Sequence, residues 1–475
     1  MKNNTKKPEN KKSNSKRSKI IKITVIVLSI LAVIAVAGAI WWNNGLRDMI
    51  KDYLQIKAYT PSTNINEAEV VKENVKSSDK AWVYAVYSDD TVILTKYSGD
   101  AEKLDVPEKI DGYAVTGIGV DCFNGNSTLK EVVLPDTLLS LEGYAFYDVQ
   151  ELTKVTIPEG IKKIDEGAFC YCPKLLEIVI PEGISELPDG VFYGCQKLSA
   201  VTLPESLKAV GAHTFEGCES LTEIKLPEGL ETIGDNAFKN CTALKTVNIP
   251  ATLKQMGTYI FDTAGVTSVE FPKGLKTLPE GMFSNCDSLE SVVLHEGLEK
   301  ISGYVFGSCE KLKEITIPKT VTSIGDYVFC KCYALERIDL STVEELGNFA
   351  FSDCTSLKEV KYSDEIEYIP PYCFGGCTVL EEINIPKGIK EIGDYAFATC
   401  DGIKKVYIPD SVTYIAPYAF ATMDNLEYIS VPDSVVEFGE AWLAGSQHVV
   451  VYCSAESTAF EYATANGIPT NTEGN

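Results

Sequence analysis

The sequence predicts a β-rich solenoid, a stack of about fifteen turns of 22–23 residues with parallel strands and short helical or 3₁₀ turns. Phe recurs every 22 or 23 residues, and Trp442 takes the slot after the last one. A Cys lies three residues after most of these Phe residues, and a Leu lies three residues further on. The recurring residues are Phe123, Phe146, Phe169, Phe192, Phe215, Phe238, Phe261, Phe283, Phe306, Phe329, Phe351, Phe374, Phe397 and Phe420.

The physics of one turn explains why the repeat must stack. Ile383 and Ile385 are two residues apart, so both point to the same face of a strand. Pro386 cannot continue a hydrogen-bonded ladder, and Gly393 permits a sharp bend before Phe397. The three-residue spacing of Phe, Cys and Leu suits a helical or 3₁₀ turn with one inward side. Because one turn cannot bury these residues alone, turns stacked about 5 Å apart would share a continuous core.

Both ends of the repeat region carry signals of caps. Two strand-like runs on either side of Ser88 predict a hairpin within residues 81–106 that covers the first open edge. The solenoid is expected to occupy residues 107–453. Residues 454–475 then predict a short capping helix, stopped near Gly467, and a tail.

The N-terminus predicts a membrane anchor. The twenty residues from Ile23 to Trp42 carry no charge, which is the length that spans a hydrocarbon layer of about 30 Å as a helix. We therefore expect a single transmembrane signal anchor at residues 20–42. Residues 1–19 are strongly basic and would remain in the cytoplasm by the positive-inside rule, with the repeat domain outside the cell.

A cleaved signal peptide is the alternative, since Ala37-Gly-Ala39 resembles a small-residue cleavage site. The apolar run is longer than the 7–15 residues usual for such peptides, which favours an uncleaved anchor. Residues 43–80 are polar and give no sign of a core, so they are interpreted as a stalk that spaces the solenoid from the membrane.

Charge and motifs exclude several function classes. The net charge is −24, although residues 1–22 carry nine basic residues, so the exported part would repel nucleic acid. The histidines of the chain, His213, His295 and His448, fall in different phases of the repeat, so their side chains should not lie together in one site. No phosphate-binding loop, metalloprotease helix or nucleophile elbow occurs. We expect no enzyme, no cofactor, no metal and no small-molecule substrate.

The fifteen cysteines would ordinarily suggest disulfides in an exported protein. Ten of them share one phase of the repeat, however, and parallel side chains one strand spacing apart are poorly placed for disulfide geometry. A buried column of free thiols, packed as small apolar groups, is the preferred interpretation. These ten are Cys172, Cys195, Cys218, Cys241, Cys286, Cys309, Cys332, Cys354, Cys377 and Cys400.

Two surface columns are candidate binding sites. In each strand the residue between the two core positions points outward, and the later members of this column mix charge, amide and aromatic groups. The predicted ligand-binding residues there are Lys361, Asn384, Lys405, Tyr407 and Tyr428. Ordinary variation on an exposed sheet is the alternative.

A second column lies two residues before each repeat Phe and should stack on the outer side. It is explained either by mutual packing of the rings or by a carbohydrate- or protein-binding stripe. Its aromatic members are Tyr259, Tyr304, Tyr327, Phe349, Tyr372, Tyr395 and Tyr418.

The pattern Ile-Gly-x-x-Ala-Phe-x-x-Cys-x-x-Leu-x-x-Ile-x-Ile-Pro over residues 90–453 resembles the BspA-type leucine-rich repeat family of surface proteins. The resemblance implies a cell-surface role in adhesion, binding of matrix or host proteins, or contact between bacteria. Departures leave the register intact. They are Asn126, Val149, Ala264 and Met423 at the Cys position and His295, Ser341 and Ser363 at the Pro position.

The sequence therefore predicts a membrane-anchored extracellular leucine-rich repeat protein that binds a protein or glycan, in adhesion or another cell-surface interaction. A passive spacer of the cell envelope without a specific ligand is the alternative class. An enzyme is a remote third.

Overall fold

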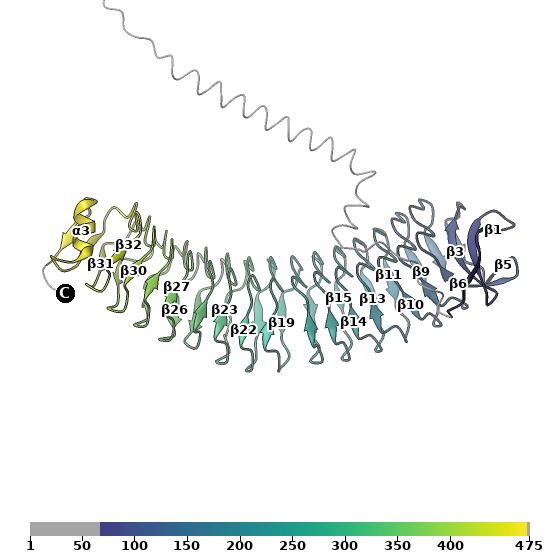
Figure 1. Ribbon diagram of the computed structural model, residues 1–475, viewed down its shortest axis with the longest axis horizontal. Helices are drawn as coiled ribbons and strands as arrows, with labels where there is room; N and C mark the ends of the chain where they lie inside the picture. The colour runs from purple at the N-terminus through teal and green to yellow at the C-terminus, as the bar shows by residue number, and fades with distance from the viewer. Residues whose placement is uncertain (1–66, 473–475) are drawn as a thin grey trace, which may run out of the picture. The chain divides into compact units, whose positions relative to one another are not determined.

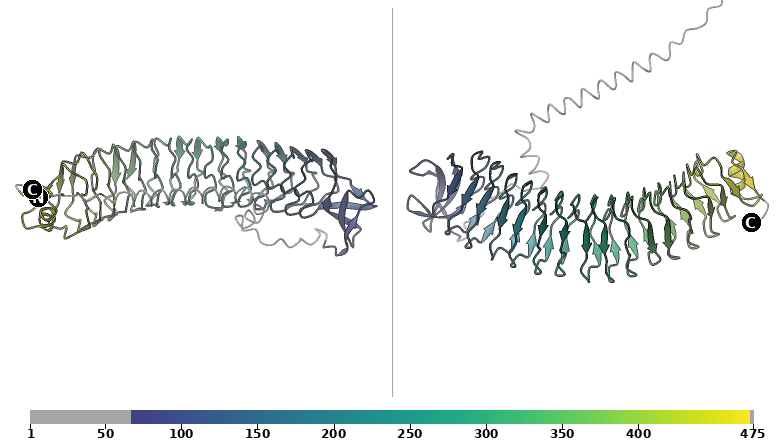
Figure 2. Two further views of the ribbon diagram at one scale, coloured as in Figure 1. Left: turned by 90° about the horizontal axis from the view of Figure 1, so that it is seen from above. Right: turned by 180° about the vertical axis from the view of Figure 1, so that it is seen from behind.

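A computed structural model describes residues 67–472, which form a β-solenoid of about 17 turns built on a repeat of about 23 residues. The turns stack in sequence order and the stack curves along its length (Figures 1 and 2). The predicted solenoid is thus confirmed, with somewhat more turns than the fifteen that the Phe register indicates. The difference arises at the ends, where capping strands pair in parallel with the repeats as additional rungs.

Each regular turn contributes one strand to each of two rows. The first row follows the Leu-x-x-Ile pattern and comprises β4 (Lys103–Asp105), β7 (Glu131–Val133), β9 (Lys154–Thr156), β11 (Glu177–Val179), β13 (Ala200–Thr202), β15 (Glu223–Ile224), β17 (Thr246–Val247), β19 (Ser268–Glu270), β21 (Ser291–Val293), β24 (Arg337–Leu340), β26 (Glu359–Tyr362), β29 (Lys405–Tyr407), β31 (Tyr428–Ser430) and β33 (Val450–Tyr452).

The second row consists of two-residue strands that lie just before the bend that recurs in each turn. It comprises β8 (Ser140–Leu141), β10 (Lys163–Ile164), β12 (Glu186–Leu187), β14 (Ala209–Val210), β16 (Thr232–Ile233), β18 (Gln255–Met256), β20 (Thr277–Leu278), β22 (Lys300–Ile301), β23 (Ser323–Ile324), β25 (Glu345–Leu346), β27 (Tyr368–Ile369), β28 (Glu391–Ile392), β30 (Tyr414–Ile415) and β32 (Glu437–Phe438).

Both rows are parallel, but neither is one unbroken sheet. In the first row, hydrogen-bonded pairing stops between β13 and β15, between β21 and β24, and between β26 and β29. Residues 314–317 and 381–386 occupy the expected strand positions in the last two gaps and form no strand. In the second row, pairing stops after β10, β18 and β25.

The N-terminal cap is a three-stranded antiparallel unit. β2 (Trp82–Tyr87) pairs with β3 (Thr91–Tyr97), as the predicted hairpin requires, and β1 (Val70–Lys76) adds a further strand on the outer side of β2. β1 lies in the range for which the sequence predicts a spacer, because its alternation of Val with charged residues gives little apolar signal. The cap joins the stack where β3 pairs in parallel with β6 (Tyr113–Ile118), and β6 also pairs with β5 (Lys109–Ile110).

The C-terminal cap contains the helix expected beyond the last turn. Helix α3 (Thr458–Ala465) begins after Ser457, whose hydroxyl accepts a hydrogen bond from the backbone N–H of Phe460. The chain then adds β34 (Thr470–Asn471) in parallel to β33. Tyr462 on the helix packs against Trp442 and so covers the last core layer.

The interior is a column of stacked phenylalanine rings. From Phe123 to Phe420 the recurring Phe residues are at most 1% exposed, and consecutive ring centroids lie 4.6–6.4 Å apart with planes within 4–17° of parallel. Trp442 ends the column and is fully buried. The inward assignment of the repeat is therefore confirmed, and each ring is covered by the turns on either side.

The cysteine column is also confirmed as free, buried thiols. In each of the ten turns the Cys Sγ donates to the carbonyl of a repeat Phe, at 3.1–3.4 Å. Burial raises the pKa of these thiols, so they stay protonated and unreactive. Cys330 differs from the other cysteines because it is only partly buried. Burial nevertheless raises the pKa of its thiol to about 11.

Thiol labelling provides a direct check of this packing. At pH 8 we expect an alkylating reagent to modify Cys330 slowly and the other cysteines hardly at all in the native protein, because the attacking thiolate is scarce. All fifteen cysteines should react after unfolding in guanidinium chloride. The count is read by intact mass spectrometry. Rapid labelling of several thiols before unfolding would contradict the buried column.

None of the helices within residues 67–472 has the length and hydropathy of a membrane span. The anchor predicted at residues 20–42, the cytoplasmic tail at 1–19 and most of the 43–80 stalk lie outside the described residues.

Candidate functional site

The outer face of the first strand row presents the predicted binding residues. Alternation along β29 buries Val406 and turns Lys405 and Tyr407 outward. Tyr407 is 59% exposed, the most exposed aromatic side chain in the described part of the chain. In the next turn, Tyr428 lies with its ring centroid 5.2 Å from that of Tyr407. The structure thus places Lys405, Tyr407 and Tyr428 side by side.

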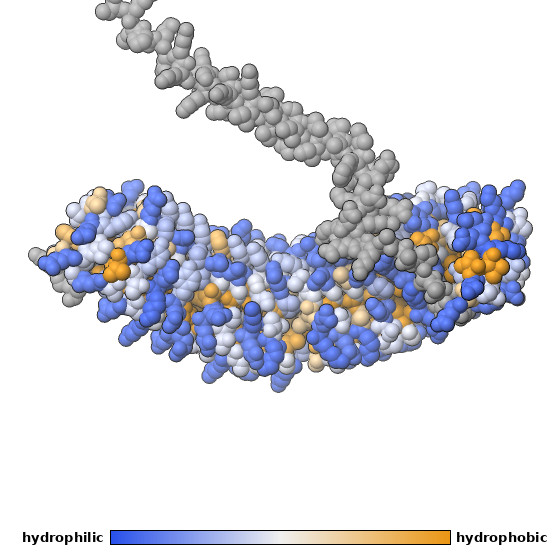
Figure 3. Space-filling model, viewed as in Figure 1, coloured by the Kyte–Doolittle hydropathy of each residue, from blue (hydrophilic) through white to orange (hydrophobic). Residues whose placement is uncertain are grey.

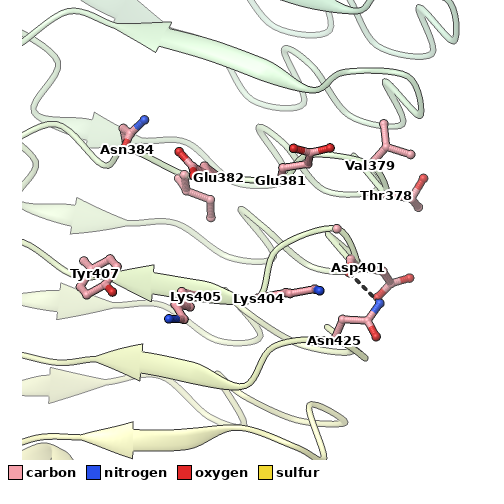
Figure 4. Close-up of a pocket in the computed structure, with 12 residues that line it drawn as sticks. Thr378, Val379, Glu381, Glu382, Asn384, Asp401, Lys404, Lys405, Tyr407 and Asn425 are labelled. Carbon is pink, nitrogen blue, oxygen red and sulfur yellow. Dashed lines mark hydrogen bonds between the residues drawn. The ribbon is translucent and has the colours of Figure 1, made fainter.

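A depression of about 850 Å³ lies beside these residues, where the first row is interrupted. Asn384 belongs to the interrupted segment, and it lines the depression together with Lys405 and Tyr407 (Figure 4). Three of the five predicted residues therefore share one hollow, and Tyr428 adjoins it through Tyr407. We refer to this region, residues 378–384 with Asp401, Lys404, Lys405, Tyr407, Asn425 and Tyr428, as the Tyr407 surface.

Lys361, the fifth predicted residue, lies apart from the hollow. Its Nζ is 3.5 Å from the carboxylate of Asp339 in the neighbouring turn, and it does not line the depression. A hydrogen bond from Ser341 is the main reason that the pKa of Asp339 is lowered, and Lys361 contributes to the same shift. Lys361 therefore belongs to a cross-turn ion pair, which makes it a weaker candidate for ligand binding.

The Tyr407 surface carries exposed charges of both signs. In other turns, lysines and glutamates pair across one rung, as in Lys154–Glu177 at 3.0 Å and Lys254–Glu231 at 2.6 Å. Glu381, Glu382, Lys404 and Lys405 are all exposed, and within residues 67–472 no ion pair engages them. Charges of both signs thus remain available beside an exposed aromatic ring.

The far rim of the depression is fixed by hydrogen bonds between neighbouring turns. Asn425 donates through Nδ2 to the backbone carbonyl of Asp401 at 2.9 Å, and the side chain of Asp401 accepts from the backbone N–H of Asp424 at 3.1 Å. Val379, 39% exposed, adds an apolar group to the same rim. These cross-turn hydrogen bonds hold the far rim of the hollow in place.

Several members of this surface were missed from the sequence. Glu381, Glu382 and Lys404 lie outside the single column from which the prediction was made, and the interruption that frees them leaves no mark in the residues Glu-Glu-Ile-Asn-Ile-Pro. Tyr452 extends the aromatic row, with its ring centroid 4.1 Å from that of Tyr428. Continuing the outward alternation to β33 would have found it.

The His, Cys, Asp and Glu side chains of the described residues do not gather into a metal site. Within residues 67–472, no group of three or more His, Cys, Asp or Glu side chains is placed to hold a metal ion. His213 pairs with Glu216, and His295 pairs with Glu270 at 3.3 Å, in separate turns. The face shown in Figure 3 carries apolar patches along the stack among polar side chains. The fold is that of a leucine-rich repeat solenoid.

The repeat itself identifies the family. The family model described as a BspA type leucine-rich repeat region matches residues 101–222, 208–336 and 322–450. The chain belongs to the BspA-type leucine-rich repeat family, whose members are typically non-enzymatic binding proteins. A search of curated proteins finds no match.

Solved structures similar to this chain come from several bacteria. A leucine-rich repeat protein from Bacteroides ovatus is 22% identical, with a TM-score of 0.55, over 86% of this chain and 100% of that one. A leucine rich cell surface protein from Faecalibacterium prausnitzii is 23% identical, with a TM-score of 0.46, over 88% and 99%. The pneumococcal vaccine antigen PcpA is 15% identical, with a TM-score of 0.41, over 86% and 100%.

Proposed function

We propose that this protein is anchored in the cell membrane by residues 20–42 and uses its extracellular solenoid to bind a ligand at the Tyr407 surface, in adhesion or another cell-surface interaction. The observation that carries the proposal is the coincidence of an exposed tyrosine, packed against a partly exposed one, with charges of both signs at a hollow in the outer face. Aromatic and cationic side chains dominate binding energy at interfaces.

The chemistry of the Tyr407 surface favours a protein over a glycan as its ligand. Glu381 and Glu382 on one turn face Lys404 and Lys405 on the next, so a partner must present both signs of charge to match them (Figure 4). Protein surfaces supply such mixed patches together with apolar groups that could cover Tyr407. The anchor is supported by the uncharged run and basic flank of the N-terminal sequence.

The test uses cells that display the full chain and a panel of purified extracellular-matrix and envelope proteins coated on plates. We expect adhesion to at least one of them, and we expect Tyr407→Ala combined with Tyr428→Ala to weaken it about 30-fold or more, because hot-spot truncations cost about 2 kcal/mol or more. Surface display of each variant is measured with an antibody to the repeats.

Two matched substitutions control for folding and for unspecific loss of surface area. Val179→Ala removes a side chain that is 58% exposed in the same column but far along the stack, and Tyr333→Ala removes a 37% exposed tyrosine outside the Tyr407 surface. Both should adhere like the parent. Adhesion that survives the double substitution would exclude this surface as the site, and failure to bind any panel member would favour the passive spacer.

A further inference from the structure

A ladder of stacked aromatic rings runs along the second surface column, in the C-terminal part of the solenoid. Tyr304, Tyr327, Phe349, Tyr372, Tyr395 and Tyr418 come from six successive turns. Neighbouring ring centroids are 4.4–4.7 Å apart and the planes are within 6–13° of parallel. Ring packing between turns, one of the two explanations open from the sequence, is thereby confirmed, and each ring is partly exposed.

The backbone at this position is unfavourable for aromatic residues. All six have φ between 54° and 59°, in the left-handed region that large side chains rarely adopt. At the same position in earlier turns the chain mostly uses Gly or a polar residue, and it uses tyrosine twice; these residues include Asp121, Tyr144, Gly167, Gly190, His213, Asn236 and Tyr259. Six consecutive aromatic residues therefore occupy a site where the fold alone would favour Gly, Asn or Asp, which points to a role beyond the fold.

A groove accompanies the ladder because the residues beside it are small. In two turns of the N-terminal half the residue after the repeat Phe is a tyrosine, Tyr147 or Tyr193, and both rings pack with Tyr171. In the ladder region the same position holds Ser352, Gly375, Ala398 and Ala421.

The hollow left beside the ladder runs over many turns. Two cavities, of about 530 and 590 Å³, lie along the ladder and share Phe349, Ser352 and Asp353 in their walls. They form one groove that extends from Tyr259 to Gly445, at right angles to the strands. We refer to it as the tyrosine groove.

The polar groups of the tyrosine groove are neutral hydroxyls available for hydrogen bonds. The phenol oxygens of the five ladder tyrosines have no hydrogen-bond partner within residues 67–472, and serine and threonine hydroxyls line the same cavities. Lys331 and Asp353 are the charged side chains in its walls, one of each sign. In a chain with a net charge of −24, such a neutral groove favours an uncharged ligand.

The backbone N–H groups on the floor of the groove are not free to bond to a peptide. The backbone N–H groups of Gly375, Gly376, Ala398, Thr399 and Ala421 are all already bonded to carbonyls of the solenoid, at 2.9–3.2 Å. An extended peptide bound by strand addition would need a free sheet edge. Buried without such partners, its own backbone polar groups would destabilise the complex.

We propose that the tyrosine groove binds a neutral polysaccharide chain lying along the solenoid axis. Successive turns offer an aromatic edge and a small floor residue, with a phenol hydroxyl in every ladder turn except that of Phe349. The groove therefore suits a polymer of repeating units. Sugar rings match this surface, since their hydroxyls can bond to the phenols while their C–H groups cover aromatic and alanine surface. The site is separate from the Tyr407 surface and does not depend on the function proposed for it.

Affinity electrophoresis of the full chain in detergent tests this proposal. The gels contain dextran, xylan or galactomannan as neutral probes, polygalacturonate as an anionic probe, or gelatin as an extended peptide. We expect retardation by at least one neutral polysaccharide. Ala398→Tyr, which places in the groove the filling residue used by the N-terminal half, should weaken that retardation at least tenfold, as should Tyr372→Ala combined with Tyr395→Ala.

Tyr171→Ala is the matched control, since it removes a partly exposed ring from the corresponding segment of a turn outside the groove, and it should bind like the parent. Circular dichroism confirms that each variant is folded. The Tyr407→Ala and Tyr428→Ala pair should also bind like the parent, which separates this proposal from the preceding one. Retardation by none of the neutral probes, retardation only by polygalacturonate or gelatin, or full binding by Ala398→Tyr would overturn it.

Discussion

Replacing Phe306 with alanine is expected to lower the free energy of unfolding by about 3–5 kcal/mol. Phe306 is fully buried, with its ring centroid 6.4 Å from that of Phe283 and 5.7 Å from that of Phe329. Truncation would leave a ring-sized cavity in the middle of the column, and the rigid turns on either side can close it only partly. Because each turn contacts mainly its neighbours, the loss should weaken the coupling between the two halves of the stack.

Urea unfolding followed by circular dichroism measures this effect. We expect a lower midpoint together with a broader or two-step transition, as the halves begin to unfold separately. Tyr407→Ala, which removes an exposed aromatic ring, is the comparison and should change the midpoint little. An unchanged transition for Phe306→Ala would contradict the stacked core.

The buried carboxylate of Glu142 should make stability fall as the pH rises. Glu142 follows β8, is 5% exposed, and burial raises its pKa from 4.5 to about 7. Nearby Asp165 raises the pKa further, while a backbone hydrogen bond from Val120 and the charge of Lys163 oppose the shift. The folded state therefore prefers the protonated acid, and this contribution is complete below pH 4.5 and lost as the pH passes through about 7.

The expected size of this term is about 3 kcal/mol between pH 4.5 and pH 8, since one pKa unit corresponds to about 1.4 kcal/mol. Urea unfolding of the parent and of Glu142→Gln over this pH range isolates it, because groups that do not interact with Glu142 titrate alike in both. Carboxylates with lowered pKa, such as Glu231 and Glu336, act in the opposite direction and cancel in the difference. The gap between the two proteins should widen in favour of the Gln variant as the pH rises. A constant gap would show that Glu142 is not buried as described.

The repeat register predicted the interior of the molecule in detail. A constant stride of Phe and Cys leaves one consistent packing, so the ring column, the thiol column and the outward position of Tyr407 could all be predicted from periodicity. The same argument placed Tyr304 to Tyr418 in a stack, which ring distances confirm.

Features that depend on the loss of regularity could not be predicted. The segment 381–386 has the same pattern as its neighbours, yet it forms no strand, and the hollow at the Tyr407 surface depends on that interruption. Strand β1 was missed because a mostly exposed edge strand needs no apolar alternation. The tyrosine groove depends on a difference between the two halves of the chain at the position after the repeat Phe. This position holds Tyr147 and Tyr193 in the N-terminal half and Ala398 and Ala421 in the C-terminal half. A search for residues that the repeats share does not detect such a difference.

The breaks in the two strand rows never fall between the same pair of turns. The first row is interrupted after β13, after β21 and after β26, whereas the second row is interrupted after β10, β18 and β25. At every step along the molecule at least one row of hydrogen bonds crosses to the next turn, and the phenylalanine column crosses all of them. We therefore expect the solenoid of residues 67–472 to bend gradually along its length, without a hinge at one turn. Sites spaced along it should then keep a nearly fixed separation under shear.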